Sequence, residues 1–205
     1  MAPMYASNEG DEPTAGSARE RVLSTAARLF YAHGVRATGI DRIIAEAGVA
    51  KMSFYRHFPS KSGLVQAFLD RRHAQWMAWF EAALQRRVAQ AGVPRLSMLA
   101  DVLGEWFAQA DFRGCAFINL VAEDGEADGP ERALAFAHKL ELQAFVAGFA
   151  RSAGVPDPDR AAALAMVVIE GAIVRTQMTG DAAMAGLAAR LLDGIAIGLR
   201  DGRAS

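Results

Sequence analysis

The chain has 205 residues, of which 52% are hydrophobic and 22% are charged, and its formal net charge is -1. This composition is typical of a globular protein and excludes a chain that is disordered throughout. Because the molecule as a whole is not basic, any binding of nucleic acid requires a local basic patch. Cys115 is the only cysteine, which excludes an intrachain disulfide framework and a multi-thiolate metal site. We therefore predict no metal and no cofactor.

The sequence predicts a cytoplasmic protein that makes no contact with a membrane. The first 16 residues are polar and contain proline and glycine, and they lack the basic-then-apolar pattern of a secretion signal. The longest nearly uncharged apolar run, residues 161–169, continues through Glu170 to Val174. It is shorter than the roughly 20 residues of a membrane span and is broken by that carboxylate. Residues 1–16 have little apolar surface to bury, so we expect a disordered tail there.

From Ser17 onward, apolar residues recur at helical spacing and strand-like alternation is absent, so the predicted fold class is all-α. Glycine and proline divide the chain into about nine expected helices. We expect an N-terminal domain of three helices over residues 17–62 and a larger C-terminal helical domain over residues 63–205. The expected helices span residues 18–33, 39–47, 51–58, 60–90, 95–110, 115–122, 130–154, 156–179 and 180–199.

The first three helices have the order and the turns of a helix-turn-helix motif. The second and third are joined by a tight turn over residues 48–50 that begins with a glycine. Gly34 follows the first helix at a position that favours a left-handed cap. Pro59 ends the third helix, and Ser60 is placed to cap the next one. Many helical proteins contain short turns, so this pattern alone is only moderately specific.

Charge is concentrated in the same segment. Residues 19–61 contain eight lysines and arginines against three acidic residues, a local net charge of +5. The rest of the chain therefore carries -6. A solvated basic face is one interpretation of this asymmetry, and a surface that binds phosphates is the other.

The third helix combines an apolar side with a polar one. At about 100° per residue, Phe54 and Phe58 fall together and are expected to pack against the first two helices. On the opposite side, Arg56 suits a bidentate bond to a guanine edge, and Met52 suits contact with a thymine methyl group. Tyr55 and His57 on the flanks either donate to phosphates or are partly buried spacers. The expected DNA contacts are Lys51, Met52, Ser53, Tyr55, Arg56, His57 and, at the next helix N-terminus, Lys61.

The stretch from Val22 to Leu64, VLSTAARLFYAHGVRATGIDRIIAEAGVAKMSFYRHFPSKSGL, resembles the DNA-binding domain of the TetR family of regulators. The resemblance implies a homodimer of nine- or ten-helix subunits whose third helix enters the major groove of double-stranded operator DNA. It also implies a C-terminal domain that binds a ligand and dimerises, and it adds Thr38 to the DNA contacts. Met52 departs from the small residue often found at its position, so the operator sequence stays open.

The C-terminal part is rich in aromatic residues and methionine, as an apolar effector pocket requires, although core packing explains the same pattern. The segment RGCAFINLVAE, residues 113–123, resembles a segment near the ligand cavity in one subset of the family. Asn119 and Glu170 interrupt apolar runs and so need a protein partner, a water or a ligand. Cys115 is either a sensor thiol or an inert buried residue. The candidate effector-binding residues are Trp76, Phe80, Trp106, Phe107, Cys115, Phe117, Asn119, His138, Met166 and Glu170.

The last expected helix carries an apolar stripe that we assign to a dimer interface, together with the preceding apolar helix. An eight-residue recognition helix spans only about 12 Å, so specific binding calls for two copies on a palindrome. The predicted interface residues are Met184, Ala188, Leu191, Leu192, Ile195 and Leu199.

The resulting hypothesis is a non-enzymatic, ligand-responsive repressor that a small, largely apolar effector releases from DNA by swinging the fourth helix. Activation instead of repression stays open. A thiol-dependent enzyme or sensor using Cys115 and a small-molecule carrier without DNA binding are the alternatives. The sequence has no recognisable catalytic partner for Cys115 and no phosphate-binding glycine loop, which disfavours the enzyme. The local charge of +5 disfavours the carrier.

Overall fold

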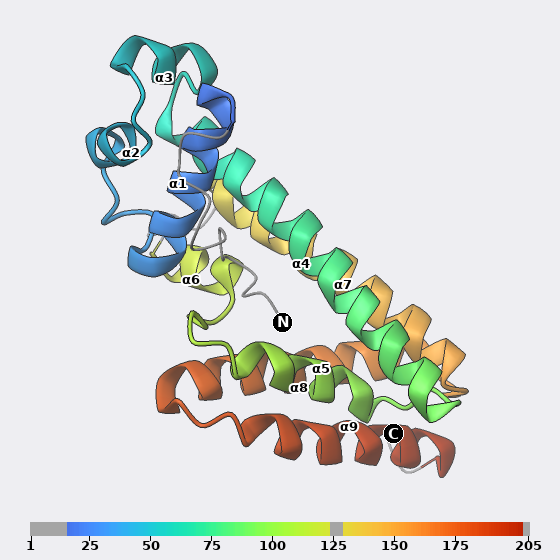
Figure 1. Ribbon diagram of the computed structural model, residues 1–205. Helices are drawn as coiled ribbons and strands as arrows, with labels where there is room; N and C mark the ends of the chain where they lie inside the picture. The colour runs from blue at the N-terminus through green and yellow to red at the C-terminus, as the bar shows by residue number, and fades with distance from the viewer. Residues whose placement is uncertain (1–15, 124–128, 203–205) are drawn as a thin grey trace. The chain divides into compact units, whose positions relative to one another are not determined.

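The computed structural model describes residues 16–123 and 129–202, and all regular structure within these ranges is helical (Figure 1). The prediction of an all-α fold with about nine helices is confirmed. The predicted disordered tail falls on residues that, Gly16 apart, lie outside the described ones. The helices are α1 (Ala18–His33), α2 (Ile40–Glu46), α3 (Lys51–His57), α4 (Lys61–Ala91), α5 (Ser97–Phe107), α6 (Ala116–Glu123), α7 (Pro130–Ser152), α8 (Pro158–Thr179) and α9 (Met184–Arg200).

The chain forms two compact units. The first comprises Met1–Trp76 and Ala116–Phe136, so α6 and the start of α7 belong with α1–α3. The second comprises Met77–Cys115 and Ala137–Ser205. We expected a boundary at residue 62 between a DNA-binding domain and an effector-binding and dimerisation domain. That boundary separates functions, not compact units, and it stays a proposal.

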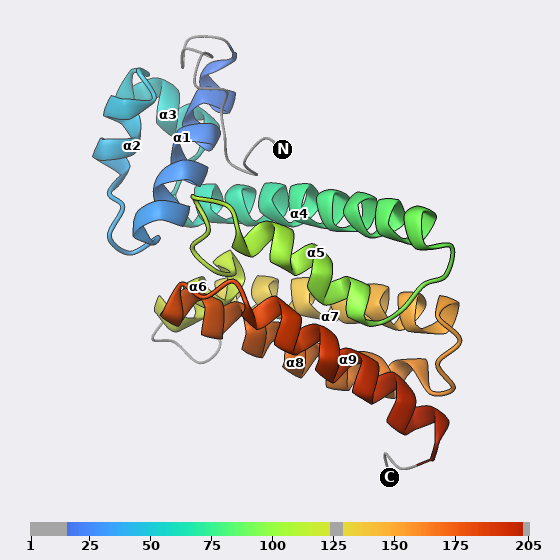
Figure 2. The ribbon, with the colours of Figure 1, turned by 60° about the horizontal axis from the view of Figure 1, so that its bottom comes forward.

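In the first unit, α2 and α3 both pack on α1 (Figure 2). Val22, Leu29 and Ile43 are fully buried there. Phe30 also packs edge-on against Phe68 of α4, with the ring centroids 5.5 Å apart. The turn between α2 and α3 contains Gly48 at a φ of +59°, which only glycine adopts readily. These contacts set α3 at a defined angle to α1.

The α1–α2 turn is attached to the C-terminal end of α6. Gly34 ends α1 at a φ of +87°, and its amide donates to the Phe30 carbonyl at 2.9 Å. The Glu123 carboxylate accepts from the Arg36 backbone amide at 2.8 Å, and the Glu123 carbonyl accepts from the Arg36 guanidinium at 3.0 Å. A Cβ on Gly34 would lie 2.6 Å from Glu123 Oε1. We call this contact of Glu123 with Gly34 and Arg36 the α6 clasp.

In the second unit, α9 packs against both α5 and α8, and the three helices lie side by side in both views (Figures 1 and 2). Gly104 of α5 permits the close approach, because a Cβ there would lie 3.1 Å from Cβ of Ala185. The α5 N-terminus is tied to α9 by the Ser97 amide, which donates to Asp193 at 3.3 Å.

Two residues of the predicted dimer stripe belong to the subunit's own core. Leu192 is fully buried and Ala188 almost fully, on the side of α9 that faces α5 and α8. The assignment of these two residues to a dimer interface is therefore wrong. The reason is that α9 is apolar around more than one face, and helical periodicity alone does not say which face turns inward.

The helix α8 has 22 residues and is long and apolar enough to cross a membrane by length and composition. The apolar run that we expected to be too short, residues 161–169 with its continuation through Glu170 to Val174, is only part of this helix. About 44% of its most apolar stretch is buried within the protein, and core helices of this kind meet the same criterion. Length and composition therefore do not decide its surroundings.

Replacement of Gly34 by alanine tests the α6 clasp. We expect Gly34→Ala to lower the stability of the protein by at least about 1 kcal/mol more than Gly48→Ala does. Both variants place a side chain at positive φ, but space is open around Gly48, whereas Glu123 occupies the space beside Gly34. Thermal unfolding followed by circular dichroism measures the difference, and equal losses in the two variants would contradict the clasp.

Candidate functional site

The inner side of α3 is held by two phenylalanines. Phe54 is fully buried and Phe58 is 3% exposed, and their ring centroids lie 6.2 Å apart. The Arg19 guanidinium of α1 lies over the Phe58 ring, 5.4 Å from its centroid. The prediction that these two rings fix α3 against the motif is confirmed.

The outer side of α3 is open to solvent. Met52 is 82% exposed, the largest exposed fraction among the exposed large apolar residues, and Tyr55 and Arg56 are exposed beside it. The Arg56 guanidinium donates to Ser53 Oγ at 3.4 Å, a long bond that leaves most of its N–H groups available. Lys51 is exposed too, whereas Ser53, His57 and Lys61 are partly exposed. The face that sequence analysis selected is accessible, and its contact with DNA stays a prediction.

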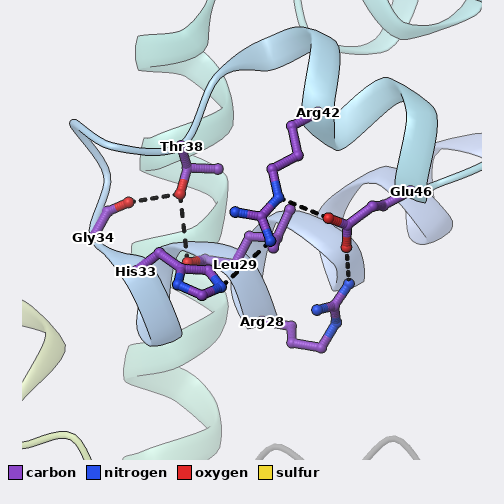
Figure 3. Close-up of polar contacts among 7 residues, drawn as sticks. All are labelled: Arg28, Leu29, His33, Gly34, Thr38, Arg42 and Glu46. Atoms are coloured by element: carbon purple, nitrogen blue, oxygen red, sulfur yellow. Dashed lines mark hydrogen bonds and ion pairs between the residues drawn. The ribbon is translucent and has the colours of Figure 1, made fainter.

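Thr38 does not belong to this face. Its side chain is fully buried, and its hydroxyl donates to the backbone carbonyl of Gly34 at 2.7 Å, with a second, longer contact to that of Leu29 (Figure 3). Gly39, not Thr38, is the N-cap of α2. A DNA contact from the Thr38 side chain, which only the family resemblance implied, is therefore wrong for this structure, because its hydroxyl is used to close the α1–α2 turn.

Two arginines of the motif converge on one carboxylate (Figure 3). The Glu46 carboxylate pairs with Arg28 of α1 and with Arg42, which lies 2.7 Å away and one turn earlier in α2. Hydrogen bonds from Arg28 and then Arg42 lower the pKa of Glu46 below its ordinary value of 4.5. This cluster was not predicted from the sequence. The four-residue spacing of Arg42 and Glu46 signals their pair, whereas the approach of Arg28 depends on how α1 and α2 pack.

Other basic residues of the motif are also engaged within the fold. Arg21 donates to the backbone carbonyls of Ala47 and Gly48, and Arg36 belongs to the α6 clasp. Lys51 and Asp41 lie 3.6 Å apart, and both are largely exposed to water. Within residues 19–61, all of which the structure describes, five of the eight basic side chains have no carboxylate in ion-pair range. They are Arg19, Arg21, Arg36, Arg56 and Lys61.

Most of the candidate effector residues are buried, which fits a pocket lining and a protein core equally well. Cys115 is 7% exposed, and His138 is 5% exposed. Asn119 is partly exposed. The other buried candidates are Trp76, Phe80, Trp106, Phe107, Phe117 and Met166.

Glu170 has a protein partner, which is one of the three alternatives predicted for it. Its side chain is 39% exposed, and its carboxylate lies 3.1 Å from Nζ of Lys139 on α7. The ion pair with Lys139 satisfies this carboxylate without a ligand, and an effector contact from Glu170 stays a prediction. The run spans more than one side of α8, and Glu170 lies where the helix is partly open to water.

Residues 22–68 match the model of the bacterial regulatory proteins of the tetR family. A helix-turn-helix transcriptional regulator of Mycobacterium tuberculosis is 30% identical over 177 residues, which cover 80% of this chain and 86% of that protein. The chain belongs to the TetR family. It is a DNA-binding transcriptional regulator with an N-terminal helix-turn-helix.

The likeness to TetR-family proteins extends over nearly the whole fold. A TetR-family transcriptional regulator from Streptomyces coelicolor is 30% identical, with a TM-score of 0.73 over 91% of this chain and 96% of that one. The regulator LmrA of Bacillus subtilis is 50% identical over 44 residues, but this match spans only 23% of its length. Identity is thus highest in a short stretch and falls when the helical remainder is included.

The acid stability of the motif tests the Glu46 cluster. A carboxylate whose pKa is lowered by folding stabilises the folded state above its ordinary pKa, and that contribution is lost as the pH falls through the lowered value. We expect Glu46→Gln to lower the melting temperature by about 1–4 °C at pH 7, because the pairs are partly exposed. The gap from the unmodified protein should narrow progressively below pH 4.5.

Glu81→Gln is the matched control, since Glu81 is exposed and accepts only from Gln85 among the described contacts. Glu81→Gln should leave the melting temperature nearly unchanged at pH 7 and at pH 3. A Glu46→Gln gap that is as large at pH 3 as at pH 7 would contradict the role of the carboxylate charge.

Proposed function

We propose that this TetR-family regulator is a cytoplasmic repressor that binds a palindromic operator as a homodimer and leaves it when a small, largely apolar effector binds. The observation that carries the proposal is that α3 is packed on its inner side and open to solvent on its outer side. Phe54 and Phe58 hold its inner side, while Met52, Tyr55 and Arg56 stand outward. An exposed short helix with a guanidinium, a phenol and an apolar tip suits the major groove.

The outward side chains divide into two kinds of contact. Arg56 and Met52 lie on the part of α3 that is most open and are proposed to read base edges. Lys51, Ser53, Tyr55, His57 and Lys61 are proposed to bind phosphates or groove walls. Lys61 begins α4, so its charge adds to the positive end of that helix dipole. Arg28 and Arg42 are committed to Glu46, so their contribution to DNA binding should be small.

The proposed dimer surface is the outward apolar face of α8 and α9. Val167 and Met178 of α8 are 73% and 76% exposed, and Leu191 of α9 is 58% exposed. The open space around Gly171 and Gly194, in the middle of these faces, would let helices of a partner approach closely. Contiguous exposed apolar faces of this kind commonly mark subunit interfaces. The proposed surface consists of Leu164, Val167, Gly171, Met178, Leu187, Leu191 and Gly194, with Met184, Ile195 and Leu199 partly exposed at its edge.

Effector control requires a link to the motif, and α6 supplies one within the first unit. Its residues Phe117 and Asn119 are candidate effector contacts, and its last residue is the Glu123 of the α6 clasp. A ligand that displaces α6 would therefore pull on the α1–α2 turn directly. A difference of about 3 kcal/mol in effector affinity between the two states is enough to weaken operator binding more than 100-fold.

Substitution of Arg56 tests operator reading. On a genomic fragment selected by the unmodified protein, we expect Arg56→Ala to weaken binding by about 10- to 100-fold, the value of one bidentate base contact. Lys61→Ala should lower the slope of log affinity against log salt concentration by about one. Fluorescence anisotropy titrations at several salt concentrations measure both effects.

Arg86→Ala is the control for these titrations, because Arg86 is an exposed arginine of α4 that lies in the second unit. It should change operator affinity by no more than about twofold. Equal binding by Arg56→Ala and Arg86→Ala would rule out base reading by the outer side of α3.

Introduction of a charge tests the proposed dimer surface. Val167→Glu should convert the dimer to a monomer at micromolar concentration, because two carboxylates would be buried in an apolar interface. Sedimentation equilibrium measures the mass. Val93→Glu is the matched control, since Val93 is 58% exposed but lies outside α8 and α9, and it should stay dimeric. An unchanged mass in Val167→Glu would place the interface elsewhere.

A further inference from the structure

The carboxylate of Asp111 has no partner in the described structure. Asp111 lies in the loop between α5 and α6, and both of its carboxylate oxygens are buried without a hydrogen bond. Two acidic residues of the same unit have basic partners. Glu105 lies 2.6 Å from Arg87, and Glu170 lies 3.1 Å from Lys139. An ionised carboxylate that is removed from water without a donor is strongly unfavourable, so something outside the described chain should complete it.

An aromatic cluster directly adjoins Asp111 in the chain. The next residue, Phe112, packs edge-on against Trp106 with the ring centroids 5.0 Å apart, and its ring lies 5.2 Å from that of Phe107. Trp106 and Phe107 are both buried. Aromatic rings attract organic cations through their negative faces and also accept an apolar body. A carboxylate next in the chain to a ring of such a cluster is a combination suited to a cation that carries hydrocarbon.

A second unsatisfied polar group lies where the same loop meets α8. The hydroxyl of Thr176 is buried and has no hydrogen-bond partner in the described structure. The next residue, Gln177, lies against Gly114, since a Cβ on Gly114 would be 2.1 Å from its Oε1. Asp111 is only three residues before Gly114, a reach of at most about 11 Å. The two unsatisfied groups therefore belong to one region of the second unit.

We propose that Asp111 and Thr176 bind the ammonium group of an organic amine whose apolar part packs on Trp106, Phe107 and Phe112. The carboxylate supplies the charge and accepts N–H bonds, and the hydroxyl oxygen accepts another. This inference rests on the proposed effector control, and it narrows the effector from a largely apolar molecule to an amphiphilic cation. Trp106 and Phe107 then bind the effector as predicted, whereas Asp111 and Thr176 are additions.

Calorimetry on the full chain with two matched probes tests the proposal. 4-Phenylbutylamine is protonated at pH 7, and 4-phenylbutanol has the same shape without the charge. We expect the unmodified protein to bind the amine at least 10-fold more tightly than the alcohol. Asp111→Asn should abolish this preference, and Thr176→Val should weaken amine binding severalfold while alcohol binding changes little.

Asp101→Asn is the matched control, because Asp101 is an exposed acidic residue of α5 in the same unit, and it should keep the full preference. Melting temperatures without ligand check folding, and Asp111→Asn should melt no lower than the unmodified protein, since it removes an unpaired buried charge. Equal affinities for the two probes, absence of binding by both, or a preference that survives Asp111→Asn would each overturn the inference.

Operator binding, measured separately, distinguishes this inference from the function on which it rests. Loss of the amine preference while the protein still binds its selected genomic fragment overturns the cation site alone. A preserved amine preference in a protein that keeps its operator at saturating amine overturns effector control instead and leaves the cation site in place.

Discussion

The burial of Phe54 and Phe58 is the constraint on which the DNA-binding surface depends. A helix of seven residues is far too short to persist by itself in water, so α3 exists because its inner side is packed against α1. Once the two rings are buried, the rotation of α3 is fixed. The opposite side of the helix then faces outward, with Met52, Tyr55 and Arg56 exposed on it.

The electrostatics of the motif are more local than its net charge of +5 indicates. Glu46 holds Arg28 and Arg42, while the α6 clasp and the end of α2 occupy Arg36 and Arg21. These arginines stabilise the packing of α1, α2 and α6, which places them in structural roles. The cations proposed to contact DNA lie at the outer side of α3 and at the start of α4. The position of each basic side chain, more than the net charge of the motif, thus decides whether it is available to bind DNA.

The C-terminal helices α8 and α9 each have two apolar faces. One face packs within the subunit, and the second remains exposed. The small residues of α8 and α9 allow tight packing on α5, with Gly104 and Ala185 in near contact. The larger side chains of Val167, Met178 and Leu191 are left outside. A helix with two apolar faces is costly in an isolated subunit, and a partner subunit would remove that cost.

The sequence by itself determined the helices, the helix-turn-helix and the outward side of α3, because these depend on periodicity, on glycine and proline, and on spacing within one short helix. The tertiary structure decided which groups are satisfied by neighbours far away in the chain. It buried the hydroxyl of Thr38, paired Glu170 with Lys139, turned Ala188 and Leu192 into the core, and left the carboxylate of Asp111 without a partner among the described residues. Periodicity tells which residues share a face of one helix. Whether that face meets another helix, a charge or water depends on packing between helices, which the local sequence pattern does not determine.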